Sequence, residues 1–377
     1  MRKFAIKVFV VFSFILFFCF DIFAAPRKPQ KGQEDWRALQ KAKDSFEKND
    51  FGTAVKFAEQ AKVIRSQNAN WQTYILDETL KNSRVRRAGD SIERVSQVLN
   101  ELKFTEASKI VSMHIEKHGL DFFNGSYSDL IEFVSVYAHY PEADFLLGKI
   151  YKLEGEYSVA LNYMKDAYEY SVNLDVSMEK YDLLYELAEL SYDLGSKDDY
   201  EKYLLVIASD DSVFTNLGYM DALLHIINTD SSDTLEKFFL LYRAEDTAGL
   251  KAFVKLGKLY MSEAENDKAL KFNAFAGILA VTKIESVLMQ RINGFKYSNF
   301  KTLLAKSSSY SDIVEWGIKN GVWELFCDLA ESAANSGKIV FSRSLFVSLS
   351  ESSPVEYWKS YASEKIVKSE NLSLIHI

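Results

Sequence analysis

The sequence has few of the residues on which disulfide-stabilised and metal-binding proteins depend. It contains two cysteines and five histidines among 377 residues. Cys19 lies in the apolar N-terminal run, which leaves Cys327 alone in the rest of the chain, so no intramolecular disulfide is expected. Cys327 belongs to the apolar stretch 323–327, and we interpret it as a buried, small hydrophobic residue.

The motifs of common enzyme classes are also missing. The chain contains no Walker A loop, no G-x-G-x-x-G, no G-x-S-x-G and no C-x-x-C. His114 and His118 lie four residues apart on a predicted helix and could face the same way, but no third metal ligand is evident and H-E-x-x-H is absent. We therefore expect a protein that is not an enzyme, with no cofactor and no metal.

Proline is scarce as well, and acidic residues outnumber basic ones, 53 to 45. Only four prolines occur, and the two in the body of the chain, Pro141 and Pro354, fall where helices would start or end. With abundant Leu, Ala, Glu, Lys and Tyr and little strict alternation, this composition favours an all-α fold. The net charge is −8. Because nucleic-acid binding depends on clustered Lys and Arg, no nucleic-acid partner is expected.

The N-terminus has the pattern of a secretory signal peptide. Three basic residues occur within the first seven positions, residues 8–20 form a nearly unbroken apolar run, and small residues follow at a plausible cleavage site. The run is short for a membrane span, so we predict a signal peptide over residues 1–24, with an uncleaved signal anchor as the alternative. Cleavage would change the net charge from −8 to −10. The expected location is the periplasm or cell envelope, with no membrane span after cleavage.

One spacing of small and aromatic residues occurs at two well-separated places. In both, intervals of three, nine and seven residues separate the members, which are Gly148, Tyr151, Ala160 and Ala167, and then Gly257, Tyr260, Ala269 and Ala276. Small residues at such intervals are what closely packed helix pairs require, and internal repetition determines the whole architecture.

A helix-pair template with twelve residues between key positions can be laid along the whole chain. It pairs Ala42 with Ala54, Val95 with Ala107, Gly148 with Ala160, Ala188 with Tyr200, Gly257 with Ala269, and Ala330 with Ser342. Residues that favour turns occur between the paired helices, at 49–50, 154–155, 195–196 and 336–337.

These positions resemble the tetratricopeptide repeat (TPR) family. The match is best over residues 141–174, through Leu147, Gly148, Tyr151 and the small residues that follow, and next best over 250–283. Weaker matches cover 35–68, 88–121, 181–214 and 323–354. The resemblance implies an all-α, right-handed superhelix of antiparallel helix pairs. The expected organisation is a signal peptide at 1–24, a tether at 25–34, repeats over 35–285, a C-terminal helical region over 286–370, and an unstructured or non-native tail at 371–377.

In such a superhelix the first helix of each pair lines the concave face, and its outward residues meet a protein or peptide ligand. We call these residues the first-helix stripe. It consists of Phe145, Lys149, Lys152, Asp182, Tyr185, Glu189, Tyr192, Lys251, Val254 and Lys258. Exposed aromatics beside charges are typical of peptide-binding grooves. The lysine and asparagine clamp of the chaperone-binding members of the family is absent, so that partner class is not expected.

Two functions remain open from the sequence. The first is an exported, non-catalytic scaffold that binds a protein or peptide. The second is a periplasmic carrier, or a transporter-associated protein, whose abundant Phe and Tyr side chains enclose a small or lipidic ligand. A scaffold should have an open, hydrated face, whereas a carrier should have a closed, dry cavity of several hundred cubic ångströms. The sequence does not identify the partner or the oligomeric state.

Overall fold

The computed structural model describes residues 26, 28, 34–82, 136–241 and 248–375, and all secondary structure within these residues is helical. The predicted signal peptide, most of the predicted tether and the predicted repeat at 88–121, with His114 and His118, lie outside the described residues. The chain divides into two compact units, 1–183 and 184–377, and the division falls within helix α9 (Glu179–Asp193).

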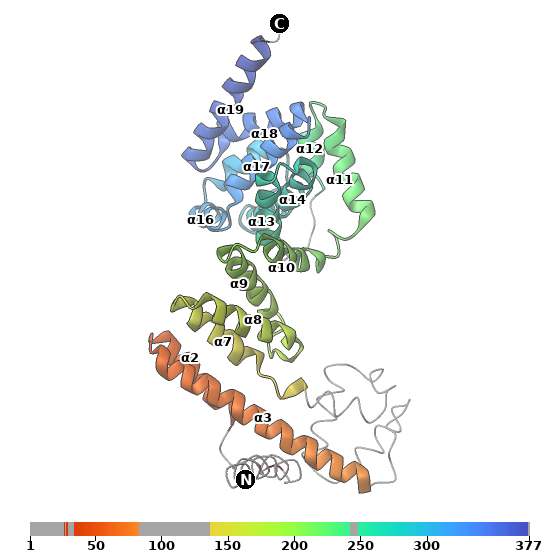
Figure 1. The fold of residues 1–377 in the computed structure, drawn as a ribbon. Coiled ribbons are helices and arrows are strands. Elements are labelled where there is room, and N and C mark those ends of the chain that lie inside the picture. Colours follow the sequence, from red (N-terminus) through yellow and green to blue (C-terminus); the bar gives the residue numbers. More distant parts are fainter. Residues whose placement is uncertain (1–25, 27, 29–33, 83–135, 242–247, 376–377) are drawn as a thin grey trace, which may run out of the picture. The chain divides into compact units, whose positions relative to one another are not determined.

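Unit 1 contains two antiparallel helix pairs (Figure 1). The pairs are α2 with α3 and α7 with α8, and α3 also packs against α7. The helices are α2 (Asp35–Glu47), α3 (Phe51–Asn82), α7 (Pro141–Leu153) and α8 (Tyr157–Glu169), followed by a short 3-10 helix (Ser171–Asn173). The core between the pairs is made of alanine, leucine and isoleucine side chains, with the ring of Tyr140 at its edge.

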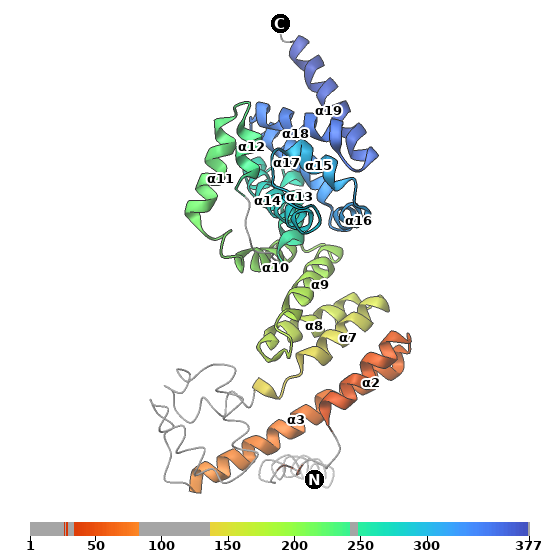
Figure 2. The same ribbon diagram turned by 180° about the vertical axis from the view of Figure 1, so that it is seen from behind.

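Unit 2 is built around α14, which lies among the other helices in both views (Figures 1 and 2). Its neighbours are α13 and α17, and α17 in turn packs against α18. After α9, the helices are α10 (Lys197–Ser209), α11 (Leu217–Thr229), α12 (Thr234–Phe239), α13 (Leu250–Ser262), α14 (Asn266–Arg291), α15 (Phe300–Ser307), α16 (Ser311–Lys319), α17 (Val322–Asn335), α18 (Ile339–Ser352) and α19 (Glu356–Ile375).

Five helix pairs are closed by the same three-residue turn. The middle residue of each has a positive φ: Asn49 (58°), Gly155 (82°), Gly195 (80°), Ala264 (57°) and Gly337 (77°). The amide of the next residue donates to a carbonyl five residues earlier, at 2.8–2.9 Å in all five turns. This is the bond that ends helices at a left-handed residue. Four of these turns lie where the sequence predicted them. The fifth, at Ala264, has no glycine to mark it.

Glycine allows the paired helices to approach closely at two equivalent positions. A Cβ atom on Gly148 would lie 2.6 Å from Cγ of Met164, and one on Gly257 would lie 1.8 Å from Oδ1 of Asn273. The small residues that the template pairs at an interval of twelve are buried wherever the structure describes them. Even Tyr200, which is bulky for its position, is buried.

Two helices continue past domain boundaries that were predicted from the sequence. The repeats were expected to end at residue 285, but α14 runs unbroken from Asn266 to Arg291, because its apolar residues continue past the predicted end and pack in the core of unit 2. The tail was expected to be unstructured from residue 371, yet α19 continues to Ile375. The interpretation of Cys327 as a buried residue is confirmed.

Candidate functional site

Two members of the first-helix stripe are buried, which corrects their assignment to a ligand-binding surface. Phe145 on α7 is 5% exposed and Val254 on α13 is 7% exposed. The ammonium group of Lys149 lies 3.8 Å from the centre of the Phe145 ring. The buried Phe145 ring therefore contacts the Lys149 side chain and is not available to a ligand. Both buried residues contribute to packing.

Tyr185 has a structural role at the start of α13. Its hydroxyl donates to the carbonyl of Ala248 at 2.7 Å and accepts from the amide of Ala252 at 3.1 Å. The first amides of a helix have no partner within the helix, so a side chain from another element that binds one of them fixes where the helix begins. Tyr185 thus links α9 to α13.

Ion pairs join the successive first helices of unit 2. Glu189 on α9 pairs with Lys255 on α13 at 3.3 Å, and Lys258 on α13 pairs with Glu324 on α17 at 2.5 Å. Each ion pair involves one predicted ligand-binding charge, Glu189 in the first and Lys258 in the second. Ion pairs between partly exposed side chains contribute little to the free energy of folding. These charges therefore remain able to interact with another molecule.

The remaining members of the stripe lie at or near the surface. Tyr192 is 56% exposed and its ring lies 5.1 Å from that of Tyr200. Asp182 and Lys251 are exposed, whereas Lys152 is half-buried. Within unit 2, Tyr192 and Lys251 are the stripe residues best placed to meet another molecule.

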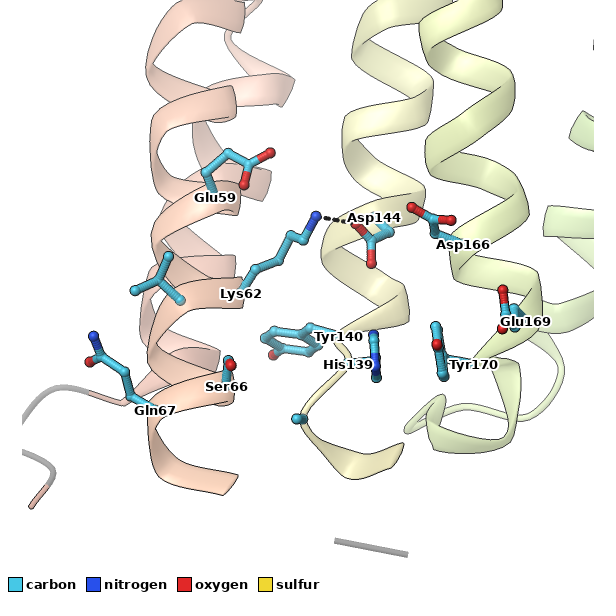
Figure 3. A pocket seen from close by; sticks show the side chains of 12 residues that line it. Glu59, Lys62, Ser66, Gln67, His139, Tyr140, Asp144, Asp166, Glu169 and Tyr170 are labelled. Atoms are coloured by element: carbon cyan, nitrogen blue, oxygen red, sulfur yellow. Dashed lines mark ion pairs between the residues drawn. The ribbon is translucent and has the colours of Figure 1, made fainter. Parts of the chain in front are cut away.

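A cavity of about 520 Å³ lies in unit 1, where no site was predicted (Figure 3). Helices α3, α7 and α8 and the segment before α7 contribute to its wall. Its polar and aromatic lining residues are Glu59, Lys62, Ser66, Gln67, His139, Tyr140, Asp144, Asp166, Glu169 and Tyr170. The cavity has the volume of a small-ligand site, but four of its five charged lining residues are acidic.

Buried contacts fix the segment that forms one wall of the cavity. The ring of Tyr140 is 1% exposed, and the guanidinium carbon of Arg65 lies 3.7 Å from its centre. Arg65 is itself held by Asp35 at 2.6 Å. On the other side, the side-chain amide of Asn173 donates to the carbonyl of Val136 at 2.8 Å. These contacts place His139 at the cavity before any ligand binds.

The inner wall carries an ion pair between a partly exposed lysine and a buried carboxylate. The Lys62 ammonium group on α3 lies 2.6 Å from Oδ1 of Asp144 on α7, whose side chain is 5% exposed. Burial raises the pKa of Asp144 to about 6, although the hydrogen bond from Lys62 opposes this rise. Beside it, the hydroxyl of Tyr163 donates to Glu59 at 2.8 Å. Asp144 and Glu59 are therefore both engaged by the protein itself.

The outer wall combines stacked rings with two further carboxylates. The rings of His139 and Tyr170 stack with their centres 3.5 Å apart and their planes 5° from parallel. Burial lowers the pKa of His139, against the opposing influence of Glu169 and Asp166. The imidazole is therefore neutral near pH 7. Figure 3 shows both carboxylates on α8, with Asp166 on the side of Asp144 and Glu169 on the side of Tyr170.

Only weak signals of this cavity are present in the sequence. Asp144 is an acid among apolar residues of a predicted first helix, and Asp166 and Glu169 lie three residues apart on the second helix of the same pair. The predicted surface was restricted to first helices, so it included neither α8 nor the segment that carries His139.

One described helix, α14, is long and apolar enough to cross a membrane, but 72% of its most apolar 18-residue window is buried inside the structure. This burial is what the core helix of unit 2 requires. Within the described residues, no group of three or more His, Cys, Asp or Glu side chains is arranged to hold a metal ion.

Comparison with known proteins gives one informative relationship. A protein of Treponema pallidum (strain Nichols), described as an uncharacterized protein, is 27% identical over 340 residues, which cover 89% of this chain and 90% of the relative. No family model and no solved structure matches the chain. The similarity extends over both units, so a related chain of nearly the same length exists in that organism.

Proposed function

We propose that this chain is an exported, TPR-like helical-repeat scaffold that binds another protein in the cell envelope. The observation that carries the proposal is the recurrence of one helix pair with one turn. Five pairs share the left-handed middle residue and the same closing hydrogen bond. Stacked helix pairs of this kind present extended surfaces, which repeat proteins use for binding other proteins.

The packing between pairs supports the same proposal. In unit 1 the second helix α3 packs against the next first helix, α7, and in unit 2 the helices α10 and α14 pack in the same way against α13 and α17. A first helix placed beside the preceding second helix is the arrangement expected of TPR-like stacking. The export component rests on the basic and apolar pattern of residues 1–24.

The carrier alternative has one supporting observation, which is the volume of the cavity in unit 1. An apolar or lipidic ligand needs a wall made mainly of hydrophobic side chains. Four carboxylates line this cavity, from Glu59, Asp144, Asp166 and Glu169. A lipidic ligand would leave these charges desolvated, so the scaffold is the better-supported function.

Affinity capture from envelope extract with the full chain tests the scaffold function. A Tyr192→Ser/Lys251→Glu variant changes the two exposed stripe residues of unit 2, and we expect it to lose a partner that the unaltered chain retains. The matched control, Tyr157→Ser/Lys202→Glu, changes an exposed tyrosine and an exposed lysine on second helices and should retain the partner. Equal capture by both variants would contradict the stripe, and no specific capture by any form would contradict the scaffold.

Export is tested separately by cell fractionation and N-terminal sequencing of the native protein. We expect the chain in the envelope fraction with its mature end near Ala25. A cytoplasmic protein that starts at Met1 would contradict this part of the proposal.

A further inference from the structure

The four carboxylates of the unit 1 cavity differ in their interactions with other side chains of the protein. Lys62 pairs with Asp144, and Tyr163 donates to Glu59, so the inner two are engaged. Asp166 and Glu169 lie on the exposed face of α8, three residues apart, and within the described residues neither is paired with a cation, although the hydroxyl of Tyr170 donates to Glu169. Residues at this spacing are neighbours on a helix surface. The mouth of the cavity is therefore a pair of carboxylates that one cationic group can reach.

The ring pair gives the same mouth a flat wall. His139 and Tyr170 stack in parallel, and both line the cavity. A stacked pair leaves its outer ring faces for a ligand, and an aromatic face attracts a cation. Because the imidazole is neutral, it adds no repulsion toward a positively charged group. The wall thus combines a planar aromatic surface with two acceptors.

We propose that this cavity binds the guanidinium group of an arginine side chain presented by a protein partner, an inference that rests on the proposed scaffold function. A guanidinium is planar, always charged, and carries several N–H donors in a rigid fork. It can stack on a ring face while donating to carboxylates, whereas an ammonium group does not stack. The cavity volume of about 520 Å³ accommodates an extended side chain but no folded element.

Anionic ligands fit this cavity poorly, because its lining carries four carboxylates and one lysine, Lys62. A phosphate or an anionic lipid headgroup would meet net negative charge. A divalent cation would need three or more converging ligands, and the described residues contain no such group.

Fluorescence anisotropy with a labelled tri-arginine peptide tests the proposal directly. The full chain is titrated in mild detergent at physiological salt, with tri-lysine and tri-citrulline peptides as matched probes. Citrulline keeps the shape of arginine but is uncharged. We expect tri-arginine to bind more tightly than tri-lysine by several-fold, and tri-citrulline not to bind. Physiological salt suppresses the general attraction of a cationic peptide to a chain of net charge −8.

Three variants locate the binding. Asp166→Asn/Glu169→Gln should weaken tri-arginine binding by about tenfold or more, since charge-assisted hydrogen bonds are lost. Glu154→Gln/Glu156→Gln removes the same charge from exposed residues of the same helix pair and should change binding by less than about twofold. His139→Ala should weaken tri-arginine more than tri-lysine, because only the planar guanidinium stacks on the ring face.

The possible outcomes distinguish failure of the guanidinium site from failure of the proposed scaffold function. Equal losses in the two carboxylate variants, or equal binding of arginine and lysine peptides, would overturn the guanidinium site. If the unaltered chain and the Asp166→Asn/Glu169→Gln variant capture the envelope partner equally, and tri-arginine does not bind the unaltered chain, the scaffold function stands and the cavity assignment falls. If the unaltered chain captures no partner but binds tri-arginine as expected, the cavity binds guanidinium and the scaffold function falls.

Discussion

The α7–α8 pair of unit 1 and the α13–α14 pair of unit 2 use one backbone design with different polar chemistry. Both have first helices of 13 residues, the same turn, and a glycine at the crossing. At that crossing, unit 1 places the flexible Met164 against Gly148, whereas unit 2 places the buried amide of Asn273 against Gly257. Small residues thus set the approach of the helices, while the residues around them determine what surface is left for binding.

The two units also differ in how their charged side chains are paired and how deeply they are buried. In unit 1 a lysine is paired with a buried carboxylate, and the carboxylates of α8 remain at a cavity. In unit 2 the charges of the first helices pair with each other across the stack, at partly exposed positions. Burial should make the first kind of pair essential and leave the second nearly neutral. Substitutions at Lys62 and at the Lys258–Glu324 pair test this contrast, and a substitution at Gly257 tests the difference at the helix crossing.

The largest effect is expected from Lys62→Met. This change leaves the Asp144 carboxylate buried without its cation, and the expected loss is about 3 kcal/mol in the free energy of unfolding at pH 8. Asp144 has a folded-state pKa of about 6, above its ordinary value of 3.8. Burial of Asp144 therefore destabilises the folded state less as the pH falls from above 6 toward 4, because the native state binds the proton at a higher pH than the unfolded state does. The substitution should accordingly cost less than half as much at pH 5.

Urea unfolding at both pH values measures this difference, with hydrogen exchange of α3 and α7 peptides locating the change in unit 1. Asp328 of unit 2, whose pKa burial raises to about 7, is common to both proteins and cancels in the comparison. Lys56→Met on the exposed face of the same helix is the matched control and should have little effect. A Lys62→Met cost that is equal at pH 5 and pH 8 would show that Asp144 is not its cause.

The second effect is expected from Gly257→Ala. Alanine favours a helix by about 1 kcal/mol over glycine, but its Cβ would overlap Oδ1 of Asn273, and overpacking of this kind costs about 1–3 kcal/mol. We expect a net loss of stability that a second change, Asn273→Ala, largely reverses. Gly148→Ala should cost less, because Met164 is flexible.

Gly52→Ala on α3 controls for helix propensity, because nothing lies within 4 Å of the added Cβ. It should stabilise the chain by about 1 kcal/mol. Denaturant unfolding of the two single variants and the double variant gives the coupling between positions 257 and 273. Additive effects would mean that the two side chains do not compete for space.

The sequence predicted the repeated element well and the binding chemistry poorly, for a physical reason. Glycine, alanine and turn residues act locally, so their spacing indicated the helix pairs and four of the five turns. The Ala264 turn was missed because alanine rarely adopts a positive φ. The cavity depends on contacts between residues far apart in the chain, such as Lys62 with Asp144 and His139 with Tyr170. No local spacing encodes those distances. Phe145 was misassigned because helical periodicity does not show which neighbour covers a face.

The smallest effect is expected from the ion pair between Lys258 and Glu324. The two side chains are 42% and 38% exposed, so water already solvates both charges. A double-mutant cycle with Lys258→Gln and Glu324→Gln should give a coupling below about 0.5 kcal/mol, and added salt should reduce it further. A coupling above about 1.5 kcal/mol, similar to that of a buried pair, would remove the contrast between the units. A weak coupling has a functional consequence. A protein partner could then replace Glu324 as the contact of Lys258 at little cost, so that the first-helix stripe of unit 2 can exchange internal ion pairs for intermolecular ones.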